Sequence, residues 1–136
     1  SVTVPHVLPF DQQSKLALDL VDAGADVIQT EGGTSARPFS PGTLGMIEKA
    51  APTLASATTI SQSLRDEGHT TPLLCASGLS AVTVPMAFAV GANGVGIGSV
   101  VNLLNDELAM LAVVKRLKES INTAKICSNK EIRGYI

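Results

Sequence analysis

The segment from Thr70 through Asn105 contains no Asp, Glu, Lys or Arg, and this feature restricts the possible folds more than any other in the sequence. An uncharged segment of this length could span a bilayer as a helix. However, it is interrupted by Pro72, Gly78, Pro85, Gly91, Gly94, Gly96 and Gly98, so no continuous helix of membrane length is expected. Buried strands of parallel sheets give the same uncharged runs. We therefore interpret the segment as buried α/β structure.

Strand and helix patterns alternate along the whole chain. Short apolar or β-branched runs predict strands at 1–6, 26–30, 53–58, 72–77 and 94–98. Helical spacing predicts helices at about 11–24, 43–51, 60–67, 82–90 and 100–121, with Pro52 expected to stop the second. This alternation is typical of βαβ units and predicts an α/β fold with a parallel sheet. Right-handed crossovers then give either a doubly wound sheet or a barrel, and the pattern does not choose between them.

Composition excludes several classes of protein. Hydrophobic residues make up 45% of the chain and charged residues only 16%, which is typical of a globular core rather than a disordered chain. The net charge of -2 and the absence of a Lys/Arg cluster argue against a nucleic-acid partner. Cys75 and Cys127 lie far apart, and no paired His, Asp or Glu spacing predicts a metal site. At 136 residues the chain is well short of the roughly 250 residues of a full TIM barrel.

Two glycine-containing loops are the main candidates for a ligand site. Ser77 and Gly78 follow one predicted strand, and Gly98 and Ser99 follow the next. In parallel α/β folds ligands collect at the carboxyl ends of the strands, where glycine and a helix N-terminus expose backbone donors to an anion. We therefore predict that these four residues bind phosphate; the alternative is that the glycines only turn the chain. The segment 91–98 has neither the dinucleotide nor the Walker pattern, which argues against an NAD or ATP loop.

The predicted strand at 26–30 delivers a carboxylate to the same end of the sheet. Glu31 is the best candidate for an acid–base catalyst, and the alternative is that its carboxylate caps its own loop. His6, at the end of the first strand, is the candidate partner, although a histidine bonded to backbone is an equally good interpretation. The long loop that follows Glu31 adds further candidates, with Arg37 able to clamp an anion: Gly32, Gly33, Thr34, Ser35 and Arg37.

Several segments of the chain resemble a known protein family. In order, these are SVTVPH, AGADVIQTEGGTS, LGMIEKAAPTLASA, LLCASGLSAVTVPMAFAVGANGVGIGSVVN and LNDELAML. They closely resemble the family called hypothetical chloroplast reading frame twenty-three, of algal plastids and cyanobacteria, over about residues 1–113. The resemblance implies a TIM barrel similar to phosphate-binding and FMN-dependent enzymes, with this chain as its C-terminal half from about the fourth to the eighth strand. It also implies a location in the chloroplast stroma or the cyanobacterial cytoplasm.

On this interpretation residues 1–123 form the C-terminal half of a TIM barrel, and residues 124–136 form a divergent, loose tail. A half barrel leaves two open sheet edges and an uncovered apolar interior. Missing residues, another chain or dimerisation would have to cover them, so a homo-oligomer is one option.

Three functions fit these observations. The leading hypothesis is a barrel that binds a phosphorylated small molecule and performs isomerase-like or lyase-like chemistry, with Glu31 as the proton-transfer group. The second is an oxidoreductase in which FMN is the phosphate-bearing ligand. The third is a non-catalytic plastid regulatory or scaffold protein built on a retained barrel. The sequence does not decide whether the protein is an enzyme, and it predicts neither a nucleic-acid nor a membrane partner.

Overall fold

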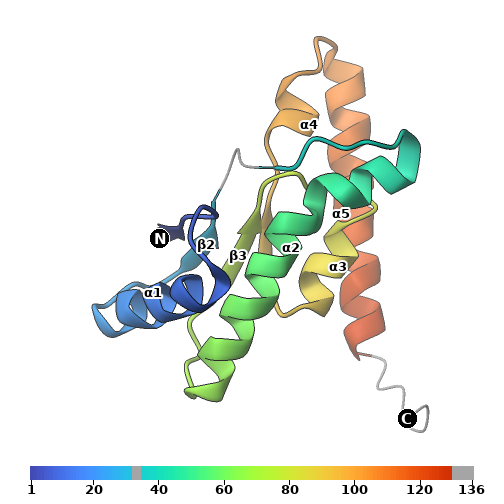
Figure 1. Cartoon of the computed structure of the whole chain (residues 1–136). Helices are drawn as coiled ribbons and strands as arrows, with labels where there is room; N and C mark the ends of the chain where they lie inside the picture. Colours follow the sequence, from blue (N-terminus) through green and yellow to red (C-terminus); the bar gives the residue numbers. More distant parts are fainter. Residues whose placement is uncertain (32–34, 130–136) are drawn as a thin grey trace, which may run out of the picture.

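The computed structural model describes residues 1–31 and 35–129, with side chains up to residue 125, and it alternates strands with helices (Figure 1). The strands are β1 (Val2–Val4), β2 (Ile28–Thr30), β3 (Leu73–Ala76) and β4 (Gly94–Gly96). The helices are α1 (Phe10–Asp22), α2 (Gly42–Asp66), α3 (Val84–Ala89), α4 (Ser99–Asn102) and α5 (Glu107–Asn129). The predicted α/β class is therefore confirmed.

The four strands form one parallel sheet in the order β1-β2-β3-β4. The register pairs Thr3 with Gln29 and Gln29 with Leu74, and Leu74 with Gly94. Because side chains of a strand alternate between the two faces of a sheet, these four positions share one face. Their neighbours along each strand lie on the other face, which the helices cover.

The hydrophobic core lies between the sheet and the helices. It joins strand residues with small and branched residues of α1 and α2: Val4, Ala17, Ile28, Ala50, Ala57, Ile60, Leu64, Leu73 and Cys75. Helices α1 and α2 pack against each other as well as against the sheet, and α3 packs against α5. Figure 1 shows α2 lying across the sheet, with α1 beside it near β1 and β2.

Residues 42–66 form the single helix α2, where we expected two helices separated by a strand. Pro52 lies inside α2 and does not stop it. An interior proline costs about 3 kcal/mol. However, α2 fully buries Ala50, Ala57 and Ile60 in the core, and this burial offsets the cost. The predicted strand at 53–58 is therefore wrong, and the sheet has four strands in the described part of the chain instead of the predicted five.

The chain after β4 also differs from the prediction of one helix over 100–121. The four-residue helix α4 ends at Asn102, and the longer α5 starts at Glu107. Asp106 starts α5, because its Oδ1 accepts the N–H of Leu108 at 3.0 Å and its backbone oxygen accepts the N–H of Met110 at 2.9 Å. Helix α5 continues to Asn129, into the segment that was expected to be a loose tail.

The charge-free segment 70–105 forms β3, α3, β4 and α4, and its residues Leu73, Cys75 and Ala87 are buried in the core. The segment is α/β structure, as the sequence predicts, but only its first part is buried, because α4 has no buried residue and Leu103 is 79% exposed. Among the described helices, none combines the length and the apolar character that a membrane span requires.

The carboxyl end of β3 is held by hydroxyl groups from two neighbouring elements. Thr30 Oγ1 accepts the N–H of Ala76 at 2.8 Å and donates to the carbonyl of Ala76 at 2.9 Å. Thr53 Oγ1, on α2, donates to the same carbonyl at 3.2 Å. Both threonines are fully buried, so water does not replace a bond that is lost. We call this set of three hydrogen bonds the threonine clamp.

We expect Thr30→Val to lower the free energy of unfolding by about 1–3 kcal/mol, because the buried N–H of Ala76 loses its acceptor. The measurement is urea unfolding of the purified protein. Thr3→Val is the matched control, since Thr3 is exposed and lies on β1, the strand that pairs with the β2 strand of Thr30. An equal decrease in the free energy of unfolding in the two variants would contradict the stabilising role of the threonine clamp.

Burial raises the pKa of the Cys75 thiol from 9.0 to about 11. Between these two pH values the unfolded chain releases a proton that the folded chain keeps, so stability falls as the pH rises. We expect the free energy of unfolding to drop by up to about 3 kcal/mol from pH 9 to 11 because of this group. A Cys75→Ala variant should show a shallower decline in urea unfolding over the same range. An identical slope in both proteins would show that Cys75 is not the titrating group.

Candidate functional site

The residues that follow the four strands gather at one edge of the sheet. Because the strands are parallel and in register, their carboxyl ends lie side by side. This edge therefore carries His6 after β1, Glu31 after β2, Ser77 after β3 and Gly98 after β4.

A cavity of about 480 Å³ opens at this edge between the ends of β3 and β4. We call it the rim cavity. All four residues predicted to bind phosphate line it: Ser77, Gly78, Gly98 and Ser99. Its walls also include Gln29 of β2, Ser35 of the following loop and Lys49 of α2. The structure thus brings both predicted loops into one hollow, together with three polar residues from the neighbouring elements.

The turn after β3 has an unusual backbone. Ser77 and Gly78 have φ angles of 93° and 69°, in the left-handed region that residues with a side chain rarely adopt. A Cβ on Gly78 would lie 2.8 Å from the carbonyl oxygen of Lys49 and 2.8 Å from the Cβ of Ser35. Glycine is therefore required at position 78 by both angle and space. Ser77 Oγ is buried and has no hydrogen-bond partner among the described residues.

The turn after β4 is different. Gly98 has a φ of -122°, which any residue adopts, and the nearest atom to an added Cβ is Asn102 Nδ2 at 4.0 Å. Space does not require a glycine here, because an added Cβ meets no close neighbour. Gly98 precedes the four-residue α4 rather than the long helix that we expected, and so short a helix contributes little dipole.

Lys49 and Gln29 line the rim cavity and were not among the site residues predicted from the sequence. Lys49 is half-buried in α2, and it is the only charged residue among the described residues that line the rim cavity. Within the described ranges it takes part in neither of the two ion pairs, which join Lys15 to Asp19 and His69 to Asp22. One sequence signal was present, because Lys49 is the only Lys or Arg between Arg37 and Arg65.

The long loop after β2 is tied to α2 on the wall of the cavity. Glu48 accepts the backbone N–H groups of Phe39 at 2.7 Å and Ser40 at 3.0 Å, and the Ser40 hydroxyl at 2.8 Å. The hydrogen bonds from Ser40 lower the pKa of the Glu48 carboxyl below its ordinary value. The N–H of Ala36 also donates to the carbonyl of Lys49 at 3.3 Å. These bonds fix the path of the loop past the cavity.

Arg37 and the tip of this loop contribute little to the described site. Arg37 is exposed and does not line the rim cavity. Gly32, Gly33 and Thr34 lie outside the described residues. Of the five predicted loop residues, Ser35 lines the cavity.

Glu31 and His6 lie next to each other, beside the rim cavity rather than in its wall. Glu31 Oε2 accepts the backbone N–H of His6 at 2.7 Å, so the carboxylate joins the ends of β2 and β1. The imidazole of His6 lines a separate hollow of about 150 Å³ with Gln13 of α1 and Ser56 of α2. The structure therefore brings this pair together through the backbone of His6, with its ring on the helix-covered side of the sheet.

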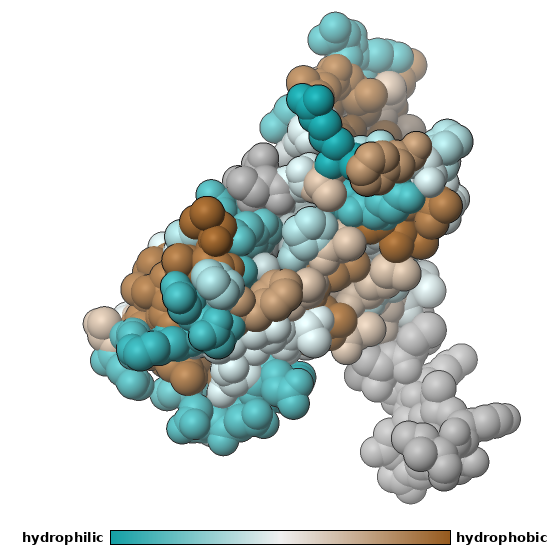
Figure 2. All heavy atoms as spheres, viewed as in Figure 1, coloured by the Kyte–Doolittle hydropathy of each residue, from teal (hydrophilic) through white to brown (hydrophobic). Residues whose placement is uncertain are grey.

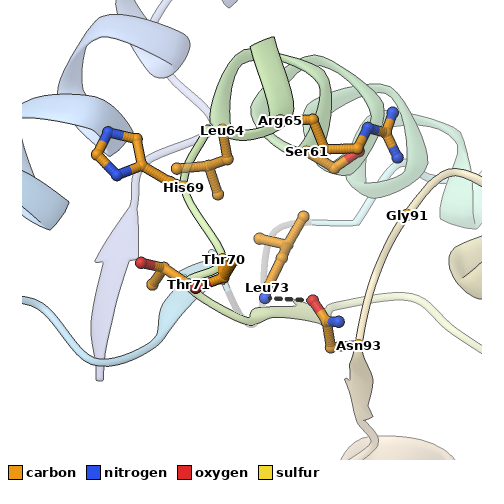
Figure 3. Close-up of a pocket in the computed structure, with 9 residues that line it drawn as sticks. All are labelled: Ser61, Leu64, Arg65, His69, Thr70, Thr71, Leu73, Gly91 and Asn93. Atoms are coloured by element: carbon orange, nitrogen blue, oxygen red, sulfur yellow. Dashed lines mark hydrogen bonds between the residues drawn. The ribbon is translucent and has the colours of Figure 1, made fainter. Parts of the chain in front are cut away.

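A second polar hollow, of about 240 Å³, lies at the opposite, amino end of β3 and β4 (Figure 3). Its polar side chains do not converge: Arg65 and His69 point away from each other, and His69 Nε2 lies 3.7 Å from Asp22 Oδ1. Asn93 Oδ1 accepts the N–H of Leu73 at 2.9 Å. This hollow lies where the end of α2 packs against the sheet, and we interpret it as a structural feature rather than a ligand site. No cluster of three His, Cys, Asp or Glu that could hold a metal occurs among the described residues.

Comparisons with known proteins place this chain among algal relatives. The model of the family described as "Protein of unknown function (DUF561)" matches residues 1–127, which extends beyond the resemblance seen in the sequence. The "Uncharacterized protein ycf23" of Porphyra purpurea is 39% identical over 122 residues, which cover 90% of this chain and 44% of the relative. The protein of the same name from Cyanophora paradoxa is 36% identical over 126 residues, covering 93% and 49%.

The chain spans less than half the length of these curated relatives. No solved structure matches it. The predicted chloroplast location is confirmed at the level of the family, because the algal relatives are plastid-encoded proteins. The chain belongs to the DUF561 family, which includes the ycf23 proteins of algal plastids.

Proposed function

We propose that the chain forms the C-terminal half of a (β/α)8 barrel and binds a phosphorylated small molecule in the rim cavity, for isomerase-like or lyase-like chemistry. The observation that carries the proposal is the meeting of two predicted phosphate loops and one lysine in a single hollow. In TIM barrels the loops after the seventh and eighth strands commonly bind phosphate.

Strand order supports the barrel. The strands follow each other across the sheet in sequence order, without the reversal that creates the switch point of a doubly wound sheet. Continued in the same direction, such a sheet closes into a barrel. With four strands rather than five, β1 to β4 correspond to strands five to eight. The missing half would pair with the free edges of β1 and β4, and the greater length of the relatives leaves room for it.

The lining of the rim cavity suits an anion. Within the described part of the chain, the charge at the rim cavity comes from Lys49, and it is positive. The hydroxyl of Ser77 is a buried donor without a partner among the described residues, and an unsatisfied buried polar group is costly unless a ligand meets it. Gly98 has no side chain to block the approach of a ligand to the backbone, and the nearest atom to an added Cβ there is 4.0 Å away.

Glu31 is the proton-transfer group in this proposal. It comes directly after the end of β2, two positions after Gln29, which lines the rim cavity. The backbone N–H of His6 orients its carboxylate at 2.7 Å. In this arrangement His6 is a positioning residue that acts through its backbone.

A non-catalytic scaffold is the second candidate, because apolar side chains are exposed on α5 and in the turn between α4 and α5. Leu103 is 79% exposed, Leu108 76% and Leu111 59%. Hydrophobic residues also show on the surface in Figure 2. An exposed apolar face of this kind is typical of a surface that another chain segment or partner covers.

A charge placed in the rim cavity tests the proposal. Gly98→Asp adds a carboxylate without a steric clash, because a Cβ has room there. We expect glycerol 3-phosphate at saturating concentration to raise the Tm of the full-length protein by roughly 5 °C. Gly98→Asp should remove this shift, since two anions repel each other in a confined site.

Gly98→Asn is the matched control, because it has the same shape without the charge, and it should keep most of the shift. Loss of the shift in both variants would indicate a steric effect and contradict the electrostatic account. The absence of a shift with glycerol 3-phosphate and inorganic phosphate in the unmodified protein would favour the scaffold. A flavin absorbance spectrum in the purified protein would instead identify FMN as the ligand.

A further inference from the structure

A second cavity, of about 260 Å³, lies beside the rim cavity and has a mostly apolar lining. Its apolar walls are Met46 of α2, Val82 of the loop before α3, Val100 of α4, and Val113 and Leu117 of α5. Thr43, Ser80 and the exposed Arg116 add polar groups to its lining. We call it the apolar cavity. Val100 lines both cavities, so the two hollows are neighbours across one side chain.

Hydrogen bonds fix the walls of the apolar cavity. Ser120 Oγ, on α5, donates to the carbonyl of Ala81 at 2.6 Å and holds the helix against the loop. Within that loop the N–H of Ser80 donates to Thr83 Oγ1 at 2.9 Å. Leu117 is only 7% exposed. The hollow is therefore part of the folded structure rather than a gap between loosely packed helices.

The same elements build both cavities. Met46 and Lys49 lie three residues apart on α2, so they share one side of the helix, with Met46 in the apolar cavity and Lys49 in the rim cavity. Met46 is 44% exposed and Val100 is 39% exposed. The side chains of Met46 and Val100 thus remain accessible at the apolar cavity, and the adjacent rim cavity carries the positive charge of Lys49.

We propose that the ligand of the rim cavity is a phosphate monoester with an apolar organic group, which enters the apolar cavity past Val100. This inference rests on the proposed phosphate site and adds the class of substrate. The phosphate group contacts the lysine side, and the hydrocarbon is removed from water by Met46, Val113 and Leu117. Each buried methylene group strengthens binding about fourfold. A polar organic group of equal length gains no such hydrophobic contribution from these three side chains.

The test compares three ligands on the full-length protein by isothermal titration calorimetry: inorganic phosphate, glycerol 3-phosphate and n-butyl phosphate. We expect n-butyl phosphate to bind about tenfold more tightly than glycerol 3-phosphate. Val113→Asn puts an amide in the apolar cavity and should reduce this preference to about twofold, with the affinity for inorganic phosphate unchanged. Val114→Asn is the matched control, because Val114 is the next residue of α5 and does not line the apolar cavity. It should keep the preference.

The outcomes separate this inference from the proposed function. If none of the three compounds binds, the phosphate site itself is wrong, and the inference fails with it. If all three bind with similar affinity, or if Val113→Asn leaves the preference intact, the phosphate site stands and the apolar cavity is not part of the ligand site. A preference that Val113→Asn removes and Val114→Asn keeps supports the inference.

Discussion

The candidate site depends on the threonine clamp at the end of β3. Thr30 and Thr53 bond to both polar groups of the Ala76 backbone, one step before the chain enters the left-handed turn at Ser77 and Gly78. A positive φ is unfavourable for Ser77, which is not a glycine, and such a conformation persists only where the surrounding structure determines it. Because the clamp is buried between β2, β3 and α2, the core that stabilises the fold also sets the position of the turn.

The placement of the other site residues follows from the same packing. Helix α2 buries Ala50 and the residues after it against the sheet, and this orients the first part of the helix toward the carboxyl ends of the strands. Lys49 and Met46 then contribute to two adjacent hollows of opposite character, one polar and one apolar. A single helix thus links a positive charge with an apolar wall at the edge of the sheet where parallel α/β proteins bind their ligands.

Much of this arrangement could be predicted from the sequence, because its signals are local. The four observed strands come from short apolar runs, and the four phosphate candidates follow from the rule that ligands lie at the carboxyl ends of strands. The errors arose where tertiary packing outweighs local preference. Residues 53–58 are rich in threonine and follow Pro52, which suggests a strand after a helix end, yet burial of Ala57 and Ile60 keeps the segment helical.

The most direct test of the central claim is a crystal structure of the full-length protein with a bound phosphate ester such as glycerol 3-phosphate. Our account predicts density for the phosphate in the rim cavity, between the backbone of Gly78 and Gly98 and within reach of Lys49. It also predicts that further strands pair with the free edges of β1 and β4 and close the barrel. Phosphate bound elsewhere, or a rim cavity filled by side chains from the rest of the protein, would contradict the account.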